Sequence, residues 1–314
     1  MTFTRIATGN AVTVLRQVPT ESINSCVTSP PYWLLRDYEV DGQLGLEPTP
    51  QEYVENLCRV FDEVWRTLRN NGTCWVVLGD TYFGSRKGAG STPGKESFRF
   101  QRKPTEIGGR AKSLALIPSR FAIAMTDRGW ILRNIIVWHK PNAIPTSVND
   151  RFTIDYEKVF FFVKAGKYYF NPQVEKSLYP GGKEAPKRPG SKGELIKRTM
   201  NPTYFARNIV TGEFRNKRCV WRIRTARRKN AHFATFPEEL IETPILAGCP
   251  EGGTVLDPFC GTGTTGIVCE RLKRSFLGIE LNPRYVEMAK QRIRDARAMA
   301  MPEAPKLQEQ ESVL

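Results

Sequence analysis

The fold of this 314-residue chain is decided by the stretch TVLDPFCGTGTT, residues 254–265. Its first residues, Thr254–Leu256, form an apolar run typical of a buried strand, and the pattern predicts a helix that begins near Thr264. Glycines between a strand and a helix let the backbone approach a ligand closely, and the helix N-terminus offers unpaired N–H groups. The stretch therefore indicates the ligand-binding loop of a parallel α/β sheet, with a purely structural glycine turn as the alternative.

Two acidic residues indicate which kind of ligand this loop would hold. Asp257 stands directly before it, and Glu280 ends the next predicted strand, about 20 residues on, where dinucleotide-binding folds hold a pair of ribose hydroxyls. The full G-x-G-x-x-G fingerprint is absent, and Asp257 would repel a pyrophosphate but could receive an ammonium group. These residues favour a nucleoside that carries an amino acid over a dinucleotide.

The position of the loop near the end of the chain constrains the topology. Too few residues follow Asp257 to complete a doubly wound sheet, so the missing strands must lie before residue 165. That region alternates apolar strands, such as Cys74–Leu78, with amphipathic helices, such as one from Thr49-Pro50 to Asn70-Asn71-Gly72. We therefore predict an α/β fold: a Rossmann-like, doubly wound, mainly parallel sheet that is circularly permuted, with its terminal strands as neighbours.

A second motif, Ser29-Pro30-Pro31-Tyr32, follows the strand predicted over 22–28. Each proline lacks an N–H and restricts the residue before it to extended conformations, so the motif is a stiff turn at the end of a strand. It presents a hydroxyl, a carbonyl and an aromatic face, which together could hold a planar ring by its amino group. A Pro-rich loop with exposed aromatic residues is the alternative. Arg36-Asp37-Tyr38 follow closely enough to border such a site.

The charge distribution indicates a polyanionic partner. The net charge is +15 at pH 7, and residues 183–229 hold 15 Lys and Arg against three acids. Aromatic residues such as Trp221 are interleaved with these charges, which favours nucleic-acid contact over a merely solvated basic face. The candidate DNA-binding residues are Lys217, Arg218, Arg222, Arg224, Arg227 and Arg228.

Composition argues against several other classes. No run of about 18 apolar residues is present, and the N-terminus lacks an apolar signal segment, so we expect neither a membrane span nor secretion. The seven cysteines are scattered without a CxxC pair and the chain has two histidines, which argues against disulfides and against a metal site. We expect a cytoplasmic protein associated with the nucleoid.

With these motifs placed, the chain resembles the beta-group amino-methyltransferases of DNA, which use S-adenosylmethionine. The order of the motifs matches that family: S-P-P-Y first, a basic region in the middle, and the F-x-G-x-G loop near the C-terminus. Further matching stretches are Gly9-Asn10, Trp138-His139-Lys140-Pro141-Asn142 and residues 232–237. The resemblance covers about residues 1–80, 115–165 and 230–298, and leaves the basic region unmatched.

The resemblance implies a role for each motif residue. Ser29 and the Pro30 carbonyl would accept hydrogen bonds from the target amino group, with Pro31 completing the turn and Tyr32 stacking on the flipped base. In the cofactor site, Asp257 and the glycine backbone would hold the methionine part, Glu280 the ribose hydroxyls, and Thr235 the methionine carboxylate. Asn10 would lie near the adenine edge. The implied cofactor-binding set is Asn10, Thr235, Asp257, Phe259, Gly261, Gly263, Thr264 and Glu280.

The same resemblance implies the reaction and its substrate. A methyl group would pass from S-adenosylmethionine to the exocyclic amino group of a base flipped out of double-stranded DNA. Within the family, Ser29 in S-P-P-Y favours N4 of cytosine, with N6 of adenine as the alternative. An RNA methyltransferase and a non-enzymatic DNA-binding protein are the other candidates. A cognate restriction endonuclease is a candidate partner, and both monomer and homodimer remain open.

These inferences predict four parts of the chain. Residues 1–164 form the first part of a catalytic core, interrupted by a mobile basic loop over 84–110. Residues 165–230 form an inserted target-recognition lobe. Residues 231–298 complete the core with the cofactor-binding part, and residues 299–314 form a disordered tail.

Overall fold

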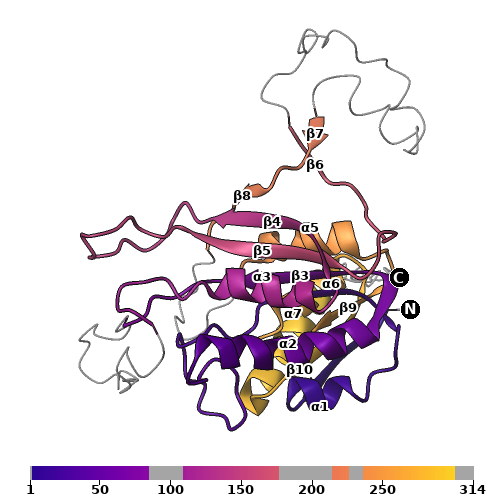
Figure 1. Ribbon diagram of the computed structural model, residues 1–314. Coiled ribbons are helices and arrows are strands. Elements are labelled where there is room, and N and C mark those ends of the chain that lie inside the picture. The colour runs from indigo at the N-terminus through magenta and orange to yellow at the C-terminus, as the bar shows by residue number, and fades with distance from the viewer. Residues whose placement is uncertain (1, 85–108, 177–213, 226–235, 301–314) are drawn as a thin grey trace, which may run out of the picture.

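The computed structural model describes residues 2–84, 109–176, 214–225 and 236–300, and an eight-stranded sheet lies at its centre (Figure 1). The order of strands across the sheet is β1-β10-β9-β2-β3-β5-β4-β8. The strands are β1 (Thr4–Thr8), β2 (Ile23–Thr28), β3 (Leu68–Leu78), β4 (Ile131–His139), β5 (Tyr156–Val163), β8 (Val220–Arg222), β9 (Thr254–Asp257) and β10 (Ser275–Glu280).

The two strands nearest the C-terminus lie between strands from the N-terminus. β10 pairs in parallel with β1 along Thr4–Thr8, and β9 pairs in parallel with β2. The expectation that the terminal strands are neighbours is therefore confirmed. In this sheet β5 alone runs against its neighbours β3 and β4. The connection between β4 and β5 contains no helix, and such a connection suits an antiparallel pair.

Helices cover both faces of the sheet (Figure 1). One face carries α1 (Ala11–Leu15), α2 (Pro50–Thr67) and α3 (Ile117–Asp127), and the other carries α5 (Glu238–Gly248), α6 (Thr264–Arg271) and α7 (Pro283–Ala300). Alternate residues of each central strand face opposite layers: on β3, Cys74, Val76 and Leu78 join the core of the first layer, and Trp75 and Val77 that of the second. Strands apolar on both faces are what a doubly covered sheet requires.

The boundary between α2 and β3 differs from the predicted one. The helix begins as predicted, with the Thr49 hydroxyl accepting a hydrogen bond from the Glu52 N–H at 3.2 Å, but it ends at Thr67. β3 already starts at Leu68, and its pairing with β2 shifts register before Thr73. Asn70-Asn71-Gly72, expected to end the helix, therefore belong to an irregular start of the strand.

The predicted recognition lobe is described only in part. Within 165–230, β6 (Val174–Lys176) and β7 (Phe214–Asn216) form a separate antiparallel pair, while β8 joins the edge of the central sheet beside β4. The core thus reaches further into this segment than its predicted boundary. Residues 177–213 and 226–235, residues 85–108 of the predicted basic loop and residues 301–314 of the predicted tail lie outside the described residues. Within the described ranges, no helix combines the length and apolarity that a membrane crossing requires.

Candidate active site

A cavity of about 1040 Å³ opens at the carboxyl ends of the parallel strands. Its walls include Gly9 after β1, Ser29 after β2, Pro258 after β9 and Leu281 after β10. The strand order reverses between β9 and β2, since the chain continues from β9 outward to β10 and from β2 outward to β3. Ligands of open α/β sheets bind at such a switch point. The volume is at the upper end of the roughly 300–1,000 Å³ of small-ligand sites, so two ligand groups fit side by side.

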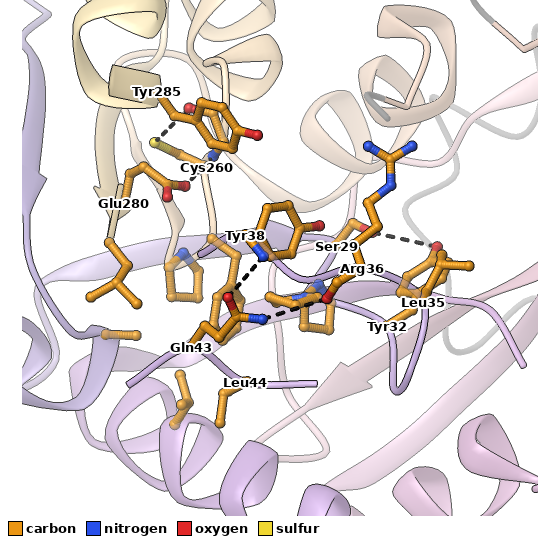
Figure 2. A pocket seen from close by; sticks show the side chains of 18 of the residues that line it. Ser29, Tyr32, Leu35, Arg36, Tyr38, Gln43, Leu44, Cys260, Glu280 and Tyr285 are labelled. Atoms are coloured by element: carbon orange, nitrogen blue, oxygen red, sulfur yellow. Dashed lines mark hydrogen bonds between the residues drawn. The ribbon is translucent and has the colours of Figure 1, made fainter. Parts of the chain in front are cut away.

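Most of the predicted site residues meet in this cavity. Figure 2 shows Ser29 and Tyr32 on one side, and Glu280, Cys260 and Tyr285 on the other. Thr235 lies outside the described residues, and Asp257 and Gly263 are buried behind the wall and do not line it. The predicted residues that line the cavity are Asn10, Ser29, Pro30, Pro31, Tyr32, Phe259, Gly261, Thr264 and Glu280.

The Ser-Pro-Pro-Tyr turn is held from two sides. The hydroxyl of Tyr53 in α2 donates to the Pro31 carbonyl at 2.7 Å. On the β3 side, the Tyr32 ring packs so close to Gly79 that a Cβ there would lie 2.6 Å from a ring carbon. The Pro30 carbonyl accepts no hydrogen bond from a described residue. The turn is therefore rigid, and Pro30, which lines the cavity, keeps a carbonyl acceptor without a donor among the described residues.

A polar cluster, Tyr32–Glu157–Lys140, supports the aromatic ring of this turn. The Tyr32 hydroxyl donates to Glu157 Oε2 at 2.6 Å, and Lys140 Nζ donates to the other carboxylate oxygen. Lys140 also lies 4.4 Å over the Trp138 ring. Burial, followed by the adjoining Glu157 carboxylate, raises the pKa of Tyr32 well above its ordinary value, so the hydroxyl remains a donor.

Sequence reasoning did not assign this cluster. Lys140 lies in a stretch that matched the family, but no role was attached to it. Glu157 carries one weak signal, a carboxylate next to Tyr156 at the start of a strand whose last five residues are apolar. The register that pairs Trp138 with Glu157 brings both residues to the cavity edge.

Asp257 anchors the loop from behind. It is 1% exposed, and its carboxylate accepts hydrogen bonds from the Thr28 hydroxyl at 2.6 Å, the Thr265 hydroxyl at 2.5 Å and the Phe259 N–H at 3.1 Å. Burial raises its pKa to about 6 even though these donors lower it. Asp257 thus connects β2, β9 and α6 through these hydrogen bonds.

Glu280 lies in the cavity wall and orders the loop from the front. Its carboxylate accepts the Gly261 N–H at 2.9 Å and the Asn282 N–H at 2.8 Å, one on each oxygen. Burial raises its pKa above the ordinary value. A carboxylate has about four acceptor positions, so acceptor capacity remains for ligand hydroxyls.

The two predicted glycines serve different purposes. Gly261 has φ +50° and lines the cavity, and a Cβ there would meet no atom within 4 Å. Gly263 has φ +81°, and a Cβ there would lie 2.8 Å from the Ala289 Cβ of α7. Gly261 therefore shapes the ligand-facing backbone, whereas Gly263 permits α7 to pack against the start of α6.

The side chain of Thr264 indicates that the loop can hold a polar ligand. Its Oγ1 is buried and has no hydrogen-bond partner among the described residues, yet Thr264 lines the cavity as the first residue of α6. A buried unpaired hydroxyl costs about 1–3 kcal/mol, and a helix N-terminus attracts anions. The hydroxyl therefore fits the polar end of a ligand such as an amino acid.

Further polar and aromatic residues complete the wall. Tyr38 and Tyr285 meet edge to face, with ring centroids 6.2 Å apart, and Gln43 accepts from the Tyr38 N–H at 2.8 Å. Arg36 and Tyr38 line the cavity as expected, while Tyr285 and Gln43 had not been singled out. Asn10 uses its side-chain oxygen to cap α1, accepting from the Val12 N–H at 3.0 Å, which leaves its amide NH₂ for a ligand.

The predicted DNA-binding residues fall into three groups. Arg222 and Arg224 are exposed. Lys217 donates to the Thr243 hydroxyl at 2.9 Å, and burial lowers its pKa, while Arg218 pairs with Glu175 at 2.7 Å, so both already hold structural contacts. The remaining two, Arg227 and Arg228, lie outside the described residues.

The protein has close sequence relatives. It is 41% identical over 287 residues to the type II methyltransferase M.XycI of Xanthomonas campestris pv. cyanopsidis, covering 91% of this chain and 86% of that one. The corresponding enzyme M.Cfr9I of Citrobacter freundii is 40% identical with the same coverage. M.SmaI of Serratia marcescens is 38% identical, covering 92% and 90% of the two chains.

Solved structures show the same fold. A protein from Thermus thermophilus described as a DNA modification methylase, solved with S-adenosyl-L-methionine, has a TM-score of 0.57 and 26% identity, covering 94% of this chain and 96% of that one. The PvuII DNA methyltransferase (cytosine-N4-specific) has a TM-score of 0.61 at 20% identity, covering 95% and 92%. The predicted α/β fold is thereby confirmed as a methyltransferase fold with a mostly parallel sheet. A profile of the DNA methylase family matches residues 23–291, and the chain therefore belongs to the N6/N4 DNA methylase family.

Proposed function

We propose that the protein transfers a methyl group from S-adenosylmethionine to N4 of a cytosine flipped out of double-stranded DNA. The observation that carries the proposal is one cavity of about 1040 Å³ lined both by the Ser29–Tyr32 turn and by Thr264 and Glu280 of the glycine loop. The order of these motifs along the chain, with the glycine loop last, supports a place in the circularly permuted beta group of the family.

The glycine-loop half of the cavity suits the cofactor, which when bound supplies a methyl group on a sulfonium. Glu280 would accept the ribose hydroxyls, and the Thr264 hydroxyl with the first N–H groups of α6 would hold the amino-acid end. Phe259 and Gly261 would border it, with Asp257 and Gly263 acting from behind the loop. A contact of Asn10 with the adenine edge through its amide NH₂ belongs to the same proposal.

The other half of the cavity suits a flipped base. An exocyclic amine is a poor nucleophile because its lone pair is delocalised into the ring. Acceptors outside the ring plane, the Ser29 hydroxyl and the Pro30 carbonyl, would favour a pyramidal nitrogen with its lone pair exposed to the methyl group. The rate gain would come chiefly from positioning, which can supply several orders of magnitude. Tyr32, held by Glu157 and by the packing on Gly79, would supply the stacking face.

Ser29 supports cytosine as the target, because the family resemblance associates S-P-P-Y more often with N4 of cytosine than with N6 of adenine. The type II class of the relatives adds a cognate restriction endonuclease to the proposal. The exposed Arg222 and Arg224 and the remaining basic residues of the lobe would contact DNA phosphates, and binding would then weaken steeply with salt.

The test is methylation of unmodified genomic DNA by the purified protein with labelled S-adenosylmethionine. Nucleosides from the digested product are separated, and modified positions are mapped along the sequence. N4-methylcytosine at one short recurring site is the expected result. Label in N6-methyladenine alone would refute the choice of base, and label in RNA in preference to duplex DNA would refute the substrate. DNA binding without any methyl transfer would contradict an enzymatic role.

A further inference from the structure

The connection between β4 and β5, residues 140–155, carries strongly exposed apolar side chains. Phe152 is 96% exposed and Ile144 is 89% exposed, more than any other large hydrophobic residue among those described. Single exposed hydrophobic residues are common on protein surfaces, but here the two extreme cases share one connection. The connection projects past the ends of its two strands (Figure 1).

This connection forms part of the cavity rim. Ile144 and Ile154 line the cavity, and so does Lys140, which binds the Glu157 carboxylate behind Tyr32. Its first turn is fixed to the segment that follows β8 by two hydrogen bonds between Asn142 and Thr225, at 3.3 and 2.9 Å. Ile144 and Ile154 thus belong to the half of the cavity assigned to the flipped base, and Phe152 lies on the same connection outside the cavity wall.

Phe152 directly follows a cationic side chain in the sequence, and the acidic residue before that cation is neutralised. The neighbouring guanidinium of Arg151 lies 3.9 Å over the Tyr82 ring, and Lys112 pairs with Asp150 at 2.6 Å. These contacts hold the base of the projection in place while Phe152 itself faces solvent. An exposed apolar side chain next to a cation suits entry into a DNA stack beside its phosphates.

We propose that Phe152 enters the DNA duplex and fills the space that the target base leaves when it turns into the cavity. The inference rests on the proposed function, because a base that reaches Tyr32 must leave the helix at the rim where this connection lies. Unpairing and unstacking a base costs free energy, and a side chain that replaces it in the stack stabilises the open state. Ile144 and Ile154 then form the apolar edge over which the base passes.

The test compares methyl transfer to two duplexes that contain the mapped recognition site. In the first the target base is normally paired, and in the second it lies opposite an abasic position, so that less work is needed to extract it. Phe152→Ala should slow single-turnover transfer to the paired duplex by roughly tenfold to a hundredfold, the range that loss of an aromatic stacking contact gives. On the abasic duplex the loss should be several times smaller. Phe152→Leu, which keeps an apolar side chain, should recover part of the rate.

Phe3→Ala is the matched control, because Phe3 is also exposed, at 50%, but precedes β1 at the opposite end of the sheet from the cavity. It should behave like the wild type on both duplexes. Equal rates for Phe152→Ala and wild type on paired DNA, or equal losses on both duplexes, would overturn the proposal. Conversion of a dimer into a monomer by Phe152→Ala in size-exclusion chromatography would assign the side chain to contact with a second copy instead. Methyl transfer to DNA by the wild type tests the proposed function itself. If the wild type transfers no methyl group, both the proposed function and this inference fail; if it does, the variants test the inference alone.

Discussion

At the scale of single residues, burial raises the pKa of two acidic side chains in the site, Asp257 and Glu280. Asp257 is 1% exposed and Glu280 lies in the cavity wall, and for both the loss of water contact outweighs the hydrogen bonds that favour the charged form. Such carboxylates order the loop through backbone and hydroxyl donors rather than through net charge. Their contribution to stability must therefore depend on pH.

Asp257→Asn should reveal this dependence. The folded-state pKa of about 6 lies above the unfolded value near 3.8, so the folded state binds the proton more tightly, and wild-type stability falls as pH rises from about 4 to about 6. Across that window the free energy of unfolding of the variant, relative to wild type, should rise by up to about 3 kcal/mol. Urea unfolding at pH 4 and pH 7 measures the difference. A pH-independent difference would contradict the assignment.

Glu157 should act on the reaction only through Tyr32, because its carboxylate accepts the tyrosine hydroxyl at 2.6 Å. Tyr32→Phe and Glu157→Gln should each lower the single-turnover rate by roughly tenfold, and the double variant should lose little more than either alone. Cofactor affinity should be unchanged. Asp155→Asn is the control, since Asp155 stands two residues before Glu157, just ahead of β5, but pairs with His139 at 3.3 Å outside the cavity wall. Additive losses in the double variant would show that Glu157 acts independently.

At the scale of elements, the loop between β9 and α6 needs its two glycines for different reasons. Gly261 has a left-handed backbone, and Gly263 has one too but also packs closely against α7. Gly261→Ala should cost about 1–2 kcal/mol through its left-handed backbone alone. Gly263→Ala should cost more, roughly 2–5 kcal/mol, because its methyl group also meets Ala289 of α7. Denaturant unfolding of the two variants measures the order. A larger loss of stability for Gly261→Ala would mean that α7 moves easily to relieve the contact between the new methyl group at position 263 and Ala289.

Prediction from sequence succeeded where the signal is local. The strand, glycine loop and helix over 254–265 follow from apolar runs and backbone chemistry within a few residues, and so does the stiff Ser29–Tyr32 turn. It was less successful where the partner is distant. The role of Glu157 depends on its hydrogen bond with Tyr32, which is far away in the sequence. Leu68 belongs to β3 rather than to α2 because it pairs with a residue of β2. The hydrogen bond between Asp257 and Thr28 is likewise beyond local prediction, because the two residues stand far apart in the sequence.

At the scale of the whole molecule, the order of elements follows from which strands are neighbours rather than from where the chain begins. β1 and β10 are paired although they stand near opposite ends of the sequence. α7 follows β10, packs against β1 and α6, and so returns the chain toward the end of the sheet at which β1 starts. The cavity lies at the other end of the strands.

This topology predicts that the protein tolerates a further circular permutation, in which the present termini are joined and new termini are opened elsewhere. Joining Leu314 to Thr2 through a short Gly/Ser spacer, with new termini placed between Thr225 and Phe236, would put the glycine loop first and leave every strand pair intact. The permuted protein should melt within a few degrees of the original and methylate the same base at the same site. A second permutant opened at Thr262, inside the loop, should keep the sheet but lose cofactor affinity, because Glu280 and Asp257 would no longer hold a continuous backbone. Failure of the first permutant to fold, with the second folded, would contradict the inference that chain order is secondary to strand adjacency.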